Sequence, residues 1–197
     1  MRIVAGEFRG RRLVAPKGRG IRPTLEVVRE AVFDVLGPRA AGARALDLFA
    51  GSGAMGLEAL SRGAAHVTWC DSSDRAVAAI RENVASLCAP QSRWAILEMP
   101  ADKALARLGR AGQRFDLVFV DPPWEENLYD GVLLGLSLAR VVEPGGLVVV
   151  EHSRRFPLSA GYGSLHATRE RRYGDGCVTW FEAAGVSRGD AEPPTEV

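Results

Sequence analysis

A run of one acid, two prolines and one aromatic residue, Asp121-Pro122-Pro123-Trp124, could hold a flat molecule that carries an amino group. The run follows the apolar stretch 115–120, which is typical of a buried strand in a parallel sheet. Proline fixes φ and lacks a backbone donor, so the turn is rigid and nearby carbonyl groups remain free to accept hydrogen bonds. The Asp121 carboxylate is an acceptor, and the Trp124 indole offers a face for stacking. These four residues are the candidate catalytic residues, and an ordinary loop with a semi-exposed Trp is the competing interpretation.

A second motif lies in the loop after the expected strand 45–49. Gly51, Gly53 and Gly56 match the pattern G-x-G-x-x-G, which lets a ligand approach the backbone at the N-terminus of a helix. Asp47 precedes these glycines. Asp71 lies 20 residues beyond Gly51, after the next expected strand, where the hydroxyl pair of a ribose needs an acceptor.

Asp47 discriminates between two cofactors that such a loop could bind. A nicotinamide dinucleotide places its pyrophosphate at the helix N-terminus, where a neighbouring acid is unfavourable. S-adenosylmethionine has no phosphate and carries a sulfonium and an amino group, which an acid attracts. Asp47 therefore favours S-adenosylmethionine, while an acid that merely caps a turn in an empty fold is the third interpretation.

The elements that must position these motifs alternate between apolar runs and amphipathic stretches, which predicts a parallel sheet covered by helices on both faces. Thr24 is the expected N-cap of a first helix that ends at Gly37-Pro38. Residues 165–173 and 177–181 alternate around a Gly-Asp-Gly turn, which predicts an antiparallel hairpin. The further expected strands are 45–49, 67–70, 94–99, 115–120 and 147–151, and the further helices are 54–61, 75–87, 103–108 and 128–142.

We divide the chain into a basic N-terminal hairpin or arm (1–23), an α/β domain (24–182) and a tail (183–197) that we expect to be disordered. The 197 residues are 47% hydrophobic and 25% charged, as in ordinary soluble domains. No apolar run is long enough to span a bilayer, and no signal-peptide pattern is present, so a cytoplasmic location without a membrane partner is expected. The three cysteines lack the spacing of a disulfide framework or zinc site, so no metal is expected.

The net charge of +1 is unevenly distributed. Residues 1–30 contain eight Lys or Arg and three acids, a net of +5. A second basic cluster comprises Arg169, Arg171 and Arg172, with Arg154 and Arg155 upstream. Basic patches on a near-neutral protein suggest a polyanionic partner bound by one face.

These motifs resemble those of Class I S-adenosylmethionine-dependent methyltransferases. The resemblance narrows to the RsmD family, the bacterial enzymes that methylate N2 of one guanine in 16S ribosomal RNA. It runs from Arg2 to about Phe181, and the segments that carry it are 2–6, 10–13, 22–24, 28–30, 57–64 and 173–175. The aromatic residue of the motif is usually Tyr or Phe, whereas this chain has Trp124.

The resemblance implies a Rossmann-like fold with a seven-stranded, mostly parallel sheet, an antiparallel C-terminal hairpin and a small N-terminal extension that contacts RNA. It implies 16S rRNA, in the small ribosomal subunit or its assembly intermediate, as the partner of a protein that we expect to be monomeric. The expected cofactor-binding residues are Asp47, Phe49, Gly51, Ser52, Gly53, Asp71, Ala101 and Asp102; the last two are less defined because Pro100 precedes Ala101 where the family often has Asn or Asp. The candidate RNA-binding residues are Arg11, Arg12, Arg22, Thr24 and Arg29, with packing against acids as the alternative for Arg22 and Arg29.

Three other functions remain open from the sequence. The same chemistry could act on DNA adenine or on a protein glutamine side chain, since both present a planar nitrogen. An inactive, cofactor-binding RNA assembly protein is disfavoured by the intact Asp47, Asp71 and Asp121. A nicotinamide oxidoreductase is disfavoured by Asp47 and by the lack of an obvious Tyr-x-x-x-Lys proton relay.

Overall fold

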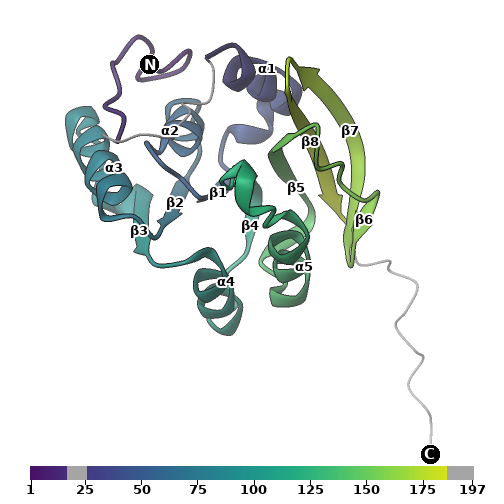
Figure 1. Cartoon of the computed structure of the whole chain (residues 1–197). Coiled ribbons are helices and arrows are strands. Elements are labelled where there is room, and N and C mark those ends of the chain that lie inside the picture. Colours follow the sequence, from purple (N-terminus) through teal and green to yellow (C-terminus); the bar gives the residue numbers. More distant parts are fainter. Residues whose placement is uncertain (17–25, 186–197) are drawn as a thin grey trace, which may run out of the picture.

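Eight strands form one sheet in the computed structural model, which describes residues 1–16 and 26–185 (Figure 1). The strands are β1 (Arg44–Leu48), β2 (His66–Asp71), β3 (Trp94–Glu98), β4 (Phe115–Val120), β5 (Val142–Ser153), β6 (Gly161–Tyr162), β7 (Leu165–Tyr173) and β8 (Gly176–Ala183). Their order is β3-β2-β1-β4-β5-β8-β7-β6, with β1 to β5 parallel and the remaining pairings antiparallel. The Rossmann-like α/β class is confirmed. The count of seven strands is corrected to eight, because the two-residue β6 adds an outer strand that pairs only with the start of β7.

Helices cover both faces of this sheet, as the alternation of the sequence predicts. They are α1 (Glu26–Leu36), α2 (Ala54–Ser61), α3 (Asp74–Leu87), α4 (Ala101–Arg110) and α5 (Tyr129–Ala139), with short 3-10 turns η1 (Gly37–Ala40), η2 (Gln91–Arg93) and η3 (Trp124–Glu126). Along β4, Leu117 and Phe119 join the core with α1, α2 and α3, whereas Val118 and Val120 join the core with α4 and α5. Residues 117–120 of this strand form a continuous apolar run because both faces of the strand are buried there.

The predicted and observed element boundaries differ most between α5 and β5. The helix expected over 128–142 ends at Ala139, where Arg140 adopts a left-handed conformation with φ 52°. β5 then begins at Val142, five residues before the expected strand, and its pairing with β4 shifts register between Phe115 and Leu117. Pro144, Gly145 and Gly146 lie in this irregular stretch, and their low strand propensity concealed the start of β5.

Residues 1–13 fold into a small hairpin that packs on the main core. Arg2 and Arg12 form an antiparallel bridge, and the apolar side chains of Ile3, Phe8 and Leu13 are buried with α1 and α2. The proposed boundary at residue 23, the N-cap Thr24 and nearly all of the C-terminal tail lie outside the described residues. No helix within residues 1–16 and 26–185 has the length and apolar character needed to cross a membrane.

Candidate active site

The two candidate motifs lie at the same edge of the sheet. In the parallel register Leu48 pairs with Cys70 on one side and with Val120 on the other, so β1, β2 and β4 end together. The chain leaves these ends into the glycine loop, Asp71 and Asp121. From β1 the chain continues outward to β2 and β3 and then crosses back to β4 on the other side of β1, and ligands bind at such a switch point in α/β sheets (Figure 1).

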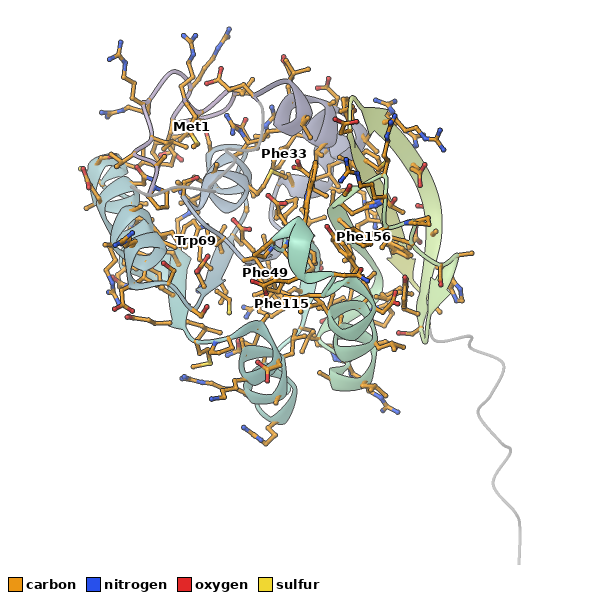
Figure 2. All side chains as sticks on the ribbon, in the orientation of Figure 1. Met1, Phe33, Phe49, Trp69, Phe115 and Phe156 are labelled. Carbon is orange, nitrogen blue, oxygen red and sulfur yellow. The ribbon has the colours of Figure 1, made fainter. Side chains whose placement is uncertain are left out.

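The glycine loop owes its shape to glycine at two positions. Gly53 precedes α2 in a left-handed conformation with φ 76°, which L side chains rarely adopt. A Cβ atom at Gly56 would lie 2.2 Å from Nε1 of Trp69, so only glycine allows α2 to pack this closely on β2. The indole of Trp69, labelled in Figure 2, also donates a hydrogen bond to the Gly53 carbonyl at 3.2 Å.

Asp71 ties the glycine loop to the end of β2. Its Oδ2 accepts the Gly51 amide at 2.8 Å, and its Oδ1 accepts the Ser73 amide at 2.9 Å. The side chain is half-buried, and each oxygen of a carboxylate has a second lone pair. Asp71 can therefore hold the loop and accept further hydrogen bonds from hydroxyl groups.

Asp47 lies behind the loop in β1. Its side chain is almost fully buried, with 3% of the residue exposed, and its Oδ2 accepts the Gly56 amide at 2.9 Å. Burial raises the pKa of Asp47 from 3.8 to about 8; the Gly56 hydrogen bond opposes this shift and the charge of Asp71 adds to it. Direct contact between Asp47 and a cofactor stays a prediction.

The stability of the ligand-free protein is expected to fall as pH rises from about 4 to about 8, because of Asp47. In this range Asp47 is ionised in the unfolded chain and protonated in the folded one, so the folded state binds more protons and loses stability as they are removed. We expect Asp47→Asn to reduce this fall. Urea unfolding of both proteins at pH 5 and pH 8 measures it, and an equal loss of unfolding free energy in both would contradict the assignment.

A cavity of about 670 Å³ opens beside Asp71, between α4 and α5. Four of the expected cofactor-binding residues line it, namely Phe49, Asp71, Ala101 and Asp102, whereas Asp47, Gly51, Ser52 and Gly53 do not. Phe49, labelled in Figure 2, has a left-handed backbone with φ 58°, a strained conformation for an aromatic residue that is typical of functional sites. Mostly apolar walls with a few acids at the rim suit a flat ring attached to a polar group. Other lining residues, with no signal in the sequence, include Cys70, Met99, Leu105, Glu126, Leu128 and Val132.

The Asp121–Trp124 segment continues directly from β4 into η3. Asp121 is half-buried, Pro122 is buried and Pro123 is exposed. Trp124 is partly buried against the core of α4 and α5. Its ring also lies close to β8, because a Cβ atom on Gly176 would be 3.2 Å from the indole. The aromatic face that the sequence predicts is thus held between two elements.

The candidate RNA-binding residues differ in their exposure to solvent. Arg11 and Arg12 are exposed on the hairpin, whereas Arg22 and Thr24 lie outside the described residues. The prediction that Arg29 contacts RNA is wrong. Its side chain has no exposed surface, its Nε lies 3.4 Å from Oε2 of the buried Glu58, and its Nη2 donates to the Arg2 carbonyl at 2.5 Å. Arg29 holds the hairpin in place instead, in line with the alternative of packing against an acid.

Asn83 is a site residue that sequence reasoning missed. This buried side chain on α3 donates through Nδ2 to the carbonyl groups of Val14 and Ser52, each at 2.9 Å. Its Oδ1 accepts the Val14 amide at 2.7 Å. Asn83 therefore joins the N-terminal segment to the glycine loop. In the sequence it was only one polar residue of an amphipathic helix.

The model of one protein family, conserved hypothetical protein 95, matches residues 1–182 of this chain. The chain belongs to this family, the RsmD family. The ribosomal RNA small subunit methyltransferase D of Escherichia coli K12, an RsmD relative, is 35% identical over 195 residues, which cover 98% of this chain and 94% of that protein. The protein of the same name from Haemophilus influenzae is 34% identical over 159 residues, 80% of this chain and 81% of that protein.

Solved structures agree with this family assignment. The structure of yhhF from Escherichia coli has a TM-score of 0.81 and 32% identity, and the match covers 94% of this chain and 98% of that one. A hypothetical protein from Thermus thermophilus has a TM-score of 0.79 and 31% identity over 94% and 99% of the two chains.

His, Cys, Asp and Glu side chains form no group of three or more that could hold a metal ion in the part of the chain that the structure describes.

Proposed function

We propose that this protein transfers a methyl group from S-adenosylmethionine to the exocyclic N2 amino group of a guanine in 16S ribosomal RNA. The observation that carries the proposal is the position of Asp121–Trp124 at the same sheet edge as the glycine loop and Asp71. It is supported by relatives that are named ribosomal RNA small subunit methyltransferase D and cover nearly the whole chain.

The residues at this edge fit S-adenosylmethionine. The apolar cavity beside Phe49 and Ala101 suits an adenine ring, and Asp71 at its rim retains lone pairs for ribose hydroxyls. Asp47 beneath the loop suits an amino group, because a cation there would favour ionisation of a carboxyl group whose pKa burial raises to about 8. When bound, S-adenosylmethionine supplies an electrophilic methyl group on a sulfonium. The glycine loop and Asp71 would hold the cofactor where β1 and β2 end.

The catalytic segment acts on the amino group of the base. The guanine N2 lone pair is delocalised into the ring, so the nitrogen is a poor nucleophile. Hydrogen bonds from its two N–H groups to the Asp121 carboxylate and to the Pro122 carbonyl favour a pyramidal nitrogen with an available lone pair. Trp124 stacks on the extruded base and aligns it for transfer. The nitrogen becomes acidic only after the methyl group has transferred, so Asp121 need not be a strong base.

A methyl-transfer assay tests this function. Purified protein and tritiated S-adenosylmethionine are incubated with four substrates: 16S rRNA, small subunits from cells that lack the protein, adenine-containing DNA, and protein. We expect incorporation into rRNA or small subunits alone, at N2 of one guanine after nucleoside mapping. Methyl incorporation into DNA or protein instead would contradict rRNA as the substrate. Binding of S-adenosylhomocysteine without methyl incorporation into any substrate would favour an inactive assembly protein.

A further inference from the structure

A basic surface lies beside the catalytic segment, on the far side of β4 from the glycine loop. We call it the β7–β8 turn surface and define it by four exposed arginines: Arg154 and Arg155 after β5, and Arg171 and Arg172 at the end of β7. The N-terminal hairpin, by contrast, docks on α2 and α3, which cover β1 and β2 (Figure 1). Basic residues therefore flank Asp121–Trp124 on both sides.

Direct contacts place this surface next to Trp124. Gly176, the first residue of β8, lies against the indole so closely that a Cβ atom there would be 3.2 Å from the ring. Gly176 pairs with Ser153 at the end of β5. The next residue, Arg154, donates its amide to the Asp175 carbonyl at 3.0 Å and places its Nε 3.5 Å from Asp175 Oδ1. Trp124, the β7–β8 turn and Arg154 are thus neighbours.

The arginines of this surface are available to an anionic partner. Arg154 pairs with Asp175 and Arg172 pairs with Glu170 at 3.4 Å, but both pairs are exposed, and exposed pairs contribute about 0–1 kcal/mol. Within residues 1–16 and 26–185 no ion pair engages Arg155 or Arg171. Phosphate groups can replace these weak contacts with charge-assisted, bidentate hydrogen bonds.

A simpler explanation exists for part of this charge. Residues 166–172 of β7 are exposed, and among the described strands β6 pairs with β7 only at Leu165 and His166. Charged side chains on such an edge prevent pairing with other chains. This explanation does not cover Arg154 and Arg155, which follow β5, a strand that is paired on both sides, with β4 and with β8.

The geometry points to the β7–β8 turn surface as a second RNA-binding surface, which holds phosphate groups next to the base bound at Asp121–Trp124. This inference rests on the proposed function. A base that leaves its stack remains attached to its flanking phosphates, which then lie near the rim of the site on the side of Arg154. Phosphate contacts fix the position of the RNA without reading its sequence, so this surface orients the target strand across the end of the sheet.

The test is a charge reversal with a matched control. The double variant Arg155→Glu/Arg171→Glu changes the proposed surface. Arg110→Glu/Arg140→Glu makes the same change in net charge at two exposed control residues. Arg110 ends α4 and Arg140 follows α5, both at the end of the sheet where the parallel strands begin. Binding to a 16S rRNA transcript and to unmodified small subunits is measured over a range of salt concentrations, alongside S-adenosylhomocysteine affinity and light scattering.

We expect the Arg155→Glu/Arg171→Glu variant to bind both RNA probes at least about tenfold more weakly, with a salt slope lower by about 1.4–1.8, because each of two lost phosphate contacts contributes about 0.7–0.9. Its S-adenosylhomocysteine affinity should stay unchanged, and the control variant should bind RNA like the wild type. RNA binding equal to that of the control would overturn the inference, and aggregation without that loss would assign the charge to edge protection. If the wild type methylates RNA but the variant binds RNA as well as the control does, only the inference about the β7–β8 turn surface is overturned. If the wild type neither binds nor methylates RNA, the proposed function is overturned as well.

Discussion

An Asp121→Ala variant is expected to lose methyl transfer almost completely, by a factor on the order of 10³, while it binds S-adenosylhomocysteine with an affinity close to that of the wild type. The carboxylate follows β4 and is the proposed acceptor for one N–H group of the target amine. Its removal leaves the base without the contact that orients its nitrogen. The glycine loop and Asp71 follow other strands and Asp121 does not line the cavity beside Asp71, so we expect this proposed cofactor site to be preserved. Single-turnover incorporation of tritiated methyl groups and calorimetric titration measure the two effects.

Asp116→Ala is the matched control for this prediction. Asp116 lies near the start of β4, at the other end of the strand from Asp121, and its Oδ2 accepts the Arg44 amide at 2.8 Å. This variant should retain turnover within a few-fold of the wild type. An Asp121→Ala enzyme with turnover within tenfold of the wild type would remove Asp121 from the catalytic role.

A Glu58→Ala variant is expected to lower the free energy of unfolding by about 3–5 kcal/mol, because it breaks a buried ion pair from one side. The Glu58 carboxylate has no exposed surface. It accepts the amides of Val4 at 2.8 Å and Ala5 at 3.0 Å, and Nε of Arg62 at 2.8 Å. Its loss leaves Arg29 as an uncompensated buried charge and two hairpin amides without an acceptor. Urea unfolding monitored by circular dichroism measures the change.

Two further variants distinguish the loss of the ion pair from a general loss of helix stability as the cause of the lower unfolding free energy. Glu30→Ala changes an exposed residue of α1 and should cost less than about 0.5 kcal/mol. Arg29→Met/Glu58→Leu removes both charges and should recover part of the lost stability, since apolar replacements of buried pairs are tolerated better than half of a pair. A double variant as unstable as Glu58→Ala would show that the hairpin amides, and not the charge of Arg29, account for the loss.

The sequence predicted the fold well where local signals and tertiary packing agree. β4 and α2 have the expected bounds, because an apolar run buried on two faces and a helix that follows a glycine loop are both strong patterns. The position of Asp121–Trp124 relative to the glycine loop also followed, since parallel strands place their carboxyl ends at one edge. Motifs far apart in the chain could thus be assigned to one site.

The failures concern residues whose environment is set by distant parts of the chain. Arg29 resembles an exposed helical arginine until Glu58, 29 residues later, is placed against it. Asp47 stays a predicted cofactor ligand; what the sequence did not show is its burial, which follows from the packing of α2 on β2. Asn83 donates to a backbone carbonyl of the glycine loop, 31 residues away. Every residue has such a carbonyl, so the residue types give no sign of this contact.

The Asn83 amide connects the N-terminal segment to the glycine loop. Its single NH₂ group bonds both to Val14, next to the hairpin, and to Ser52 in the glycine loop. We expect a ligand that restrains Val14 to restrain Ser52 as well, which lowers the entropy cost of ordering the loop for the second ligand. By reciprocity, the factor by which one ligand tightens the other is the same in both directions. We therefore expect this one buried side chain to couple the affinity of the proposed RNA site to that of the proposed S-adenosylmethionine site.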